Sequence, residues 1–267
     1  MLKKVMKYDL RASWRICAPL LLASGIVAVV CCALMYFTIS LSDFESMIAA
    51  MLTVMGFYVI GIFAIVILAT VAYFAVFVRY YRSMFTDEGY LTMVLPVKTS
   101  VLFGAKVLSA LVMNVIICAA AIASFLLAVV APMMLSDISE FSQIWRSLSS
   151  MLTSIGIGST ESVEIAVLVI NMIVSFVEGI IIFMSSITIG SVLISRYKVV
   201  GSIGIYLAVS FVHSLIMTVC ESMFYSYAIS SLSIFVLSSA IRTVLAIAFS
   251  ALLYFISLRA LKYKLNI

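Results

Sequence analysis

The stretch GFYVIGIFAIVILATVAYFAVFV, from Gly56 to Val78, decides the fold because it contains no charged residue over its whole length. An apolar run of about 18 or more residues is long enough to cross a bilayer as a helix. Hydropathy, with charged and turn residues as stops, predicts six such spans. They are Ile16–Phe37, Gly56–Val78, Val107–Val130, Val167–Ile194, Gly201–Val219 and Thr243–Leu258. We therefore expect an all-α, multi-pass membrane protein with one transmembrane domain over residues 1–267.

Basic residues are sorted to one side of the expected spans. Of the 16 Lys and Arg residues, all but Arg146 and Arg242 fall on the side of the N-terminus. Most acidic residues, such as Asp43, Asp137 and Glu221, fall on the other side. Because Lys and Arg in short loops resist translocation, the basic side is expected to be cytoplasmic. This topology puts both termini in the cytoplasm.

The composition excludes several classes of protein. With 66% hydrophobic and 10% charged residues, the chain does not have the polar surface of a soluble domain. Its formal charge of +5 is dispersed over separate helix ends and predicts no nucleic-acid partner. Five cysteines without paired spacing and one histidine predict neither disulfides nor a metal site. The long basic leader and the absence of a small-residue cleavage site predict that the first span is retained.

Residues 1–15 are expected to form an amphipathic helix on the membrane surface. Basic residues fall on one helical face and apolar residues on the other, and Trp14 is placed at headgroup level. Asp9 interrupts the apolar face, which slightly favours contact with a cytoplasmic partner over a role in topology alone.

The segment 79–100 joins the second and third spans and is longer and more polar than a tight turn. Thr86 is expected to cap a short helix with Asp87 and Glu88 in its first turn, and Pro96 to end it. This helix is expected to expose Tyr90, Met93 and the acidic pair to the cytoplasm.

Here the chain resembles the permease subunits of ABC-2-type ABC exporters. The resemblance rests on the pattern FTDEGYLTMVLPV from Phe85 to Val97, placed between the second and third of six spans after a basic amphipathic helix. It implies a coupling helix that receives motion from an ATPase, an interfacial connecting helix at 1–15, and a bacterial cytoplasmic membrane. The implied ATPase contacts are Asp9, Asp87, Glu88, Gly89, Tyr90 and Met93.

No phosphate-binding loop of the form G-x-x-x-x-G-K-[ST] occurs in the sequence. We therefore expect that this chain is not an enzyme and binds no cofactor, with ATP and Mg²⁺ bound by a separate ATPase chain. The resemblance implies two permease subunits, as a homodimer or a pair of related chains.

Two segments on the far side are expected to have structure of their own. Residues 131–166 are Ser-rich and predict a connector with an interfacial helix around 141–152. Residues 220–242 are apolar but interrupted by serines, which predicts a re-entrant helix pair. The resemblance implies re-entrant helices at the same place.

Glu178 is the only carboxylate deep within an expected span. Charged groups there cost about 2.5–3.5 kcal/mol on insertion scales, so they are normally paired or functional. His213 in the next, antiparallel span lies within about two helical turns of the same depth, so the two residues can pair. The alternatives are packing roles, with Glu178 protonated and bonded to Asn171 or nearby hydroxyls, and His213 neutral. Glu178, His213 and Asn171 are the candidate residues of a transport pathway.

Two other functions remain open at this stage. One is a proton-coupled secondary carrier that uses Glu178 and His213, although no internal repeat is visible. The other is a membrane sensor or immunity protein that transports nothing.

The charge distribution predicts the accessibility of five positions. Cysteines introduced at Ser42, Ser149 and Ser226 should react with an impermeant thiol reagent in intact cells. Cysteines introduced at Ser83 and Ser195 should not react. Labelling of Ser83→Cys in intact cells would contradict the six-span topology.

Overall fold

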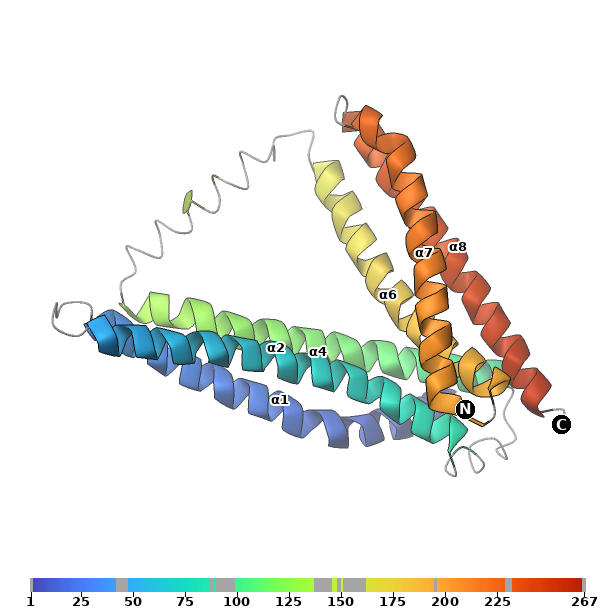
Figure 1. The fold of residues 1–267 in the computed structure, drawn as a ribbon, viewed down its shortest axis with the longest axis horizontal. Coiled ribbons are helices and arrows are strands. Elements are labelled where there is room, and N and C mark those ends of the chain that lie inside the picture. The colour runs from blue at the N-terminus through green and yellow to red at the C-terminus, as the bar shows by residue number, and fades with distance from the viewer. Residues whose placement is uncertain are drawn as a thin grey trace. The chain divides into compact units, whose positions relative to one another are not determined.

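The computed structural model describes residues 2–41, 48–86, 89, 99–136, 146–147, 150, 162–194, 196–228 and 232–265. Within these ranges the secondary structure is helical, and no strand occurs. Figure 1 shows the long helices. They are α1 (Leu2–Leu41), α2 (Ile48–Phe85), α4 (Thr99–Ser136), α6 (Ser162–Leu193), α7 (Lys198–Ala228) and α8 (Leu232–Leu265).

Each of these helices contains a segment that is long and apolar enough to cross a membrane. The segments are Val5–Phe37, Leu52–Phe85, Thr99–Pro132, Ala166–Leu193, Lys198–Met223 and Leu237–Tyr263. The expectation of an all-helical fold with six helices long and apolar enough to span a membrane is therefore confirmed for the described residues. The helices extend beyond the expected spans, because residues such as Arg79 and Arg82 at the end of α2 are good helix formers.

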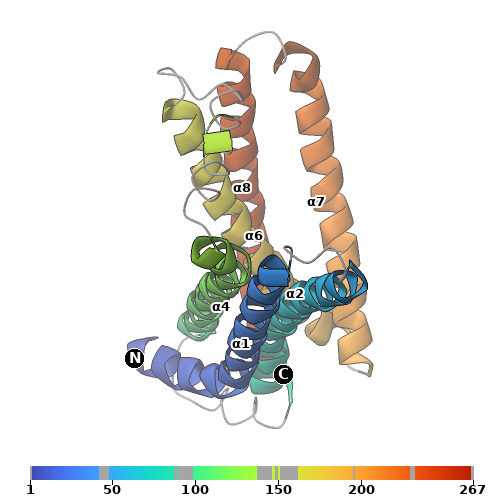
Figure 2. The ribbon, with the colours of Figure 1, turned by 90° about the vertical axis from the view of Figure 1, so that its left-hand side faces the viewer.

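The amphipathic segment 1–15 is not a separate helix in the structure. Residues from Leu2 onward belong to α1, which contains Pro19. Proline has no amide to bond to the carbonyl of Arg15, and its ring crowds that carbonyl, which bends helices. Figure 2 shows that α1 bends in its N-terminal third. A position of these turns on the membrane surface remains a prediction.

The expected re-entrant pair is likewise not confirmed. Residues 220–228 are the last turns of α7, and residues 232–242 are the first turns of α8. Among the serines that suggested an interruption, Ser222 bonds back into its own helix: its Oγ donates to the carbonyl of Val219 at 2.9 Å. Such bonds satisfy a hydroxyl within a continuous helix.

The structure describes the two helical ends of the segment 131–166. Most of the interfacial helix expected at 141–152 lies outside the described residues.

By their contacts, the residues form two compact units. The first unit comprises residues 1–7, 77–111 and 157–267, and the second comprises residues 8–76 and 112–156. The second unit holds most of α1, α2 and α4. Its core contains Ala28, Cys31, Tyr58, Ile65 and Ala128, with Ser24 Oγ and Ser124 Oγ 3.5 Å apart.

In the first unit, α6, α7 and α8 pack against one another. The closest approach between α6 and α7 involves two glycines. A Cβ on Gly190 would overlap the backbone of Ser202, and one on Gly201 would overlap the side chain of Ile194. Ser202 Oγ also lies 3.3 Å from the carbonyl of Ile187 on the neighbouring helix. The small residues therefore allow the two backbones to meet, as is common between membrane helices.

This close approach predicts opposite effects for two glycine substitutions. Gly190→Ala should lower the stability of the folded protein in detergent by about 1–3 kcal/mol, because its Cβ meets backbone that cannot move aside. Gly204→Ala is the matched control on α7, and it should raise the stability. No atom lies within 4 Å of its Cβ, and alanine favours a helix over glycine. Thermal unfolding of both variants tests this. Equal or greater stability of Gly190→Ala would contradict the packing described.

Candidate functional site

Glu178 on α6 and His213 on α7 meet inside the first unit. Glu178 Oε1 and His213 Nε2 lie 2.8 Å apart, and the side chains are 6% and 23% exposed. The sequence placed the two residues at similar depth on antiparallel helices, and the structure brings them into contact. A buried carboxylate inside a membrane span thus has an ionisable partner.

The contact leaves hydrogen-bonding capacity unused. The two atoms are within ion-pair distance, but the imidazole N–H is not aligned with the carboxylate oxygen well enough for a hydrogen bond. Neither atom has another hydrogen-bond partner among the described residues. The phenyl ring of Phe249 on α8 lies against the imidazole, with ring centroids 5.1 Å apart.

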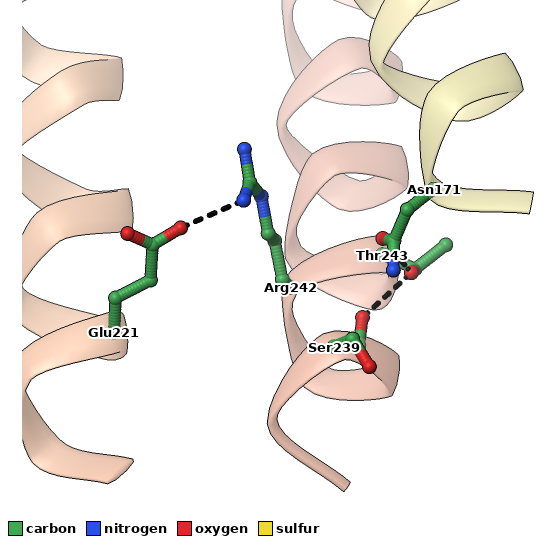
Figure 3. A network of polar contacts seen from close by, with 5 residues as sticks. All are labelled: Asn171, Glu221, Ser239, Arg242 and Thr243. Atoms are coloured by element: carbon green, nitrogen blue, oxygen red, sulfur yellow. Dashed lines mark hydrogen bonds and ion pairs between the residues drawn. The ribbon is translucent and has the colours of Figure 1, made fainter. Parts of the chain in front are cut away.

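Two further polar contacts connect the same three helices (Figure 3). Arg242 Nη1 on α8 lies 2.8 Å from Glu221 Oε1 on α7. Thr243 Oγ1, the next residue on α8, lies 2.6 Å from Asn171 Oδ1 on α6. This hydroxyl has a single proton to share between Asn171 and the carbonyl of Ser239. Each pair of helices in the bundle is therefore connected by at least one polar contact.

A cavity of about 240 Å³ lies among these helices. Its polar lining comes from Ser175, Glu178, Tyr206, Ser210, His213 and Arg242. Ile182 and Met217 supply apolar surface. In the described part of the chain, no group of three or more His, Cys, Asp or Glu side chains is placed to hold a metal ion. The cavity is thus a small, mixed polar and apolar site that contains one buried carboxylate.

The structure changes the grouping of the predicted pathway residues. Asn171 contacts Thr243 and not Glu178, from which it is separated by about two turns of α6. Arg242 was missed, because the sequence placed it just outside the sixth span as one of two basic residues on the far side. The position of Arg242 as an isolated charge within an apolar stretch was the available signal of an ion pair, since a charged residue there normally has a partner.

A second polar cluster ties the end of α2 to three other helices. Tyr80 Oη and Thr188 Oγ1 of α6 lie 2.6 Å apart, and Lys106 Nζ of α4 donates to Ser83 Oγ at 2.8 Å. Lys198 Nζ of α7 lies 3.3 Å from the carbonyl of Phe85, the last residue of α2. We call these six residues the α2-end cluster. The members Tyr80, Ser83, Phe85, Lys106 and Thr188 are all buried.

Sequence reasoning assigned Lys106 only a topological role, and it did not single out Tyr80, Thr188 or Lys198. Lys106 is 4% exposed, so its charged group is enclosed by protein. A buried ammonium group requires polar partners, and Ser83 is one. The signal for burial was the position of Lys106, seven residues after the start of its helix. A single sequence does not identify Ser83 as the hydroxyl that accepts its hydrogen bond.

The predicted ATPase contacts lie next to this cluster in the chain. Asp87, Glu88, Tyr90 and Met93 are outside the described residues. Gly89 is described and buried: its N–H donates to the carbonyl of Thr86 at 2.8 Å, and a Cβ there would overlap the backbone of Met84.

Thr86 Oγ1 donates back to the carbonyl of Arg82, which satisfies the end of α2. Most of the helix that Thr86 was expected to cap lies outside the described residues, so the cap stays a prediction. Asp9 is half-buried on α1 and has interactions of its own.

Comparison of the chain with family models, characterised proteins and solved structures found no match.

The contact between Tyr80 and Thr188 predicts a measurable coupling. Tyr80→Phe or Thr188→Val alone should destabilise the protein by about 0.5–1.5 kcal/mol, because each removes the buried contact between the two hydroxyls. The double variant should cost less than the sum of the two single changes. Thermal unfolding in detergent measures all three. Strict additivity would show that the two hydroxyls do not interact.

Proposed function

We propose that this chain is the membrane-spanning permease subunit of an ATP-driven exporter of the ABC-2 type. In this proposal it lies in a bacterial cytoplasmic membrane with both termini in the cytoplasm. A separate ATPase chain binds ATP and Mg²⁺, and a second permease subunit completes the transport pathway. The chain itself catalyses no reaction.

The observation that carries the proposal is the position of the segment from Phe85 to Val97. It leaves α2 directly after the α2-end cluster, whose contacts reach α4, α6 and α7. A force applied to this segment would act on the end of a helix that is bonded to three others. That is the mechanical requirement for a coupling element, since packed helices shift as units.

The arrangement gives the proposed mechanism concrete residues. An ATPase that closes on ATP pushes the segment after Phe85, and the buried contacts of Tyr80 and Lys106 pass the displacement to α6 and α4. Lys198 passes it to α7, where it holds the last carbonyl of α2. These helices then change their tilt, which alternately opens the pathway to each side of the membrane.

One specific observation favours a second candidate, a proton-coupled carrier. The 2.8 Å contact between Glu178 and His213 joins two groups that exchange protons readily, inside a membrane span. In such a carrier the proton gradient, and not ATP, would change the state of the bundle. Dependence of transport on a proton gradient in vesicles without ATP distinguishes the two candidates.

If the segment from Phe85 to Val97 couples the chain to an ATPase, variants in it should weaken the complex with the ATPase without preventing folding. Tyr90→Ala, or the pair Asp87→Lys and Glu88→Lys, should leave the chain folded in the membrane but weaken its complex with the ATPase. An aromatic anchor at an interface is commonly worth about 2 kcal/mol, or roughly thirtyfold in affinity. Copurification of the ATPase and ATP hydrolysis in proteoliposomes measure the effect.

Tyr263→Ala provides a matched control. Tyr263 is a highly exposed tyrosine near the end of α8, outside the proposed coupling segment. Its loss should change neither measurement. If the Tyr90 and acidic-pair variants behaved like this control, the segment would not couple the chain to an ATPase.

A further inference from the structure

We propose that the cavity among α6, α7 and α8 binds the positively charged group of a small organic cation, in competition with a proton on the Glu178–His213 pair. The inference deepens the proposed function by naming a substrate class, and it rests on that function only where the ligand is called a substrate. Binding itself requires neither an ATPase nor transport.

The sign of the ligand follows from the charges around the cavity. Arg242 and Glu221 lie 2.8 Å apart, so their charges compensate each other. The remaining ionisable pair is Glu178 with His213. Arg242 is the permanent cation of the lining, and it is paired with Glu221; when His213 is neutral, no other described lining residue offers a cation to the buried carboxylate of Glu178. Such a charge is costly in a span, and a cationic group removes the cost.

The lining suits an organic cation better than a hydrated metal ion. One carboxylate is far from the six to eight oxygen ligands that calcium requires, and Ile182 and Met217 offer apolar surface. The ring of Tyr206 lies at the wall, where an aromatic face attracts an ammonium group. A volume of about 240 Å³ is below the usual 300–1,000 Å³ of drug-sized sites, so it fits a small cation or the charged end of a larger amphipathic molecule.

The same geometry makes the proton a competitor. When His213 takes up a proton on its imidazole, the imidazolium pairs with Glu178 and the site becomes neutral. Entry of a cation then requires that this proton leave, so one positive charge replaces another. The other ionisable or charged groups near the pair are Tyr206 and Glu221 on α7 and Arg242 on α8. The Arg242–Glu221 pair has no net charge, so the proton that competes with the ligand is the one shared by Glu178 and His213.

The binding test uses the full chain in lipid nanodiscs without an ATPase. The probe is benzyltrimethylammonium, whose charge does not change with pH. The controls are its uncharged isostere neopentylbenzene and the anion phenylacetate. We expect binding of the cation only, with affinity at pH 8 about tenfold or more above that at pH 5.5. Binding of the uncharged isostere with equal affinity would overturn the proposal, as would preferential binding of phenylacetate.

Four variants assign the binding to the named residues. Glu178→Gln should weaken cation binding at pH 8 by about tenfold or more, because it removes the charge and keeps the shape. Glu178→Asp keeps the carboxylate and should retain much of the affinity. His213→Gln should bind the cation with little dependence on pH between 5.5 and 8. Glu221→Gln leaves the charge of Arg242 uncompensated and should weaken cation binding.

Thermal unfolding of each variant reports whether it is folded. Unchanged cation binding in folded Glu178→Gln would overturn the proposal. The same conclusion follows if the pH dependence persists in folded His213→Gln. Because no ATPase is present, cation binding without ATPase association would reject the proposed function alone, and ATPase association without cation binding would reject this inference alone.

Discussion

A polar group inside a bilayer has no water to bond, so it must find its partner within the protein. The structure of this chain depends on that constraint. Several polar contacts of the first unit join two different helices, such as Tyr80 with Thr188 and Glu178 with His213. Because lipid tails are as apolar as the helix surfaces, these contacts and close glycine packing help to determine which helices associate.

Two of the helices connect the α2-end cluster with the cavity. On α6, Thr188 belongs to the cluster and Glu178 to the cavity, about 15 Å apart along the helix axis. On α7, Lys198 belongs to the cluster and His213 to the cavity. In the proposed mechanism, a displacement at the end of α2 would reach the pair that holds the buried charge, because packed helices shift as units. This link unites the proposed coupling segment with the proposed binding site.

Much of the fold was predictable because a membrane span leaves a strong signal in one sequence. The six helices and the similar depth of Glu178 and His213 follow from apolar length and helical rise. The re-entrant pair predicted from the serines of 220–242 is not confirmed: residues 220–228 are the last turns of α7, and residues 232–242 are the first turns of α8. The partners of Lys106, Arg242 and Asn171 depend on how helices rotate and tilt against one another, and a hydropathy pattern does not specify rotation.

The central claim is that this chain is one part of an ATP-driven membrane complex. The most direct test is the mass of the intact complex released from native membranes in lipid nanodiscs. The account predicts an assembly of two permease chains, identical or related, with two ATPase chains. Recovery of the chain alone, or only with copies of itself, from membranes in which it transports its substrate would contradict the account.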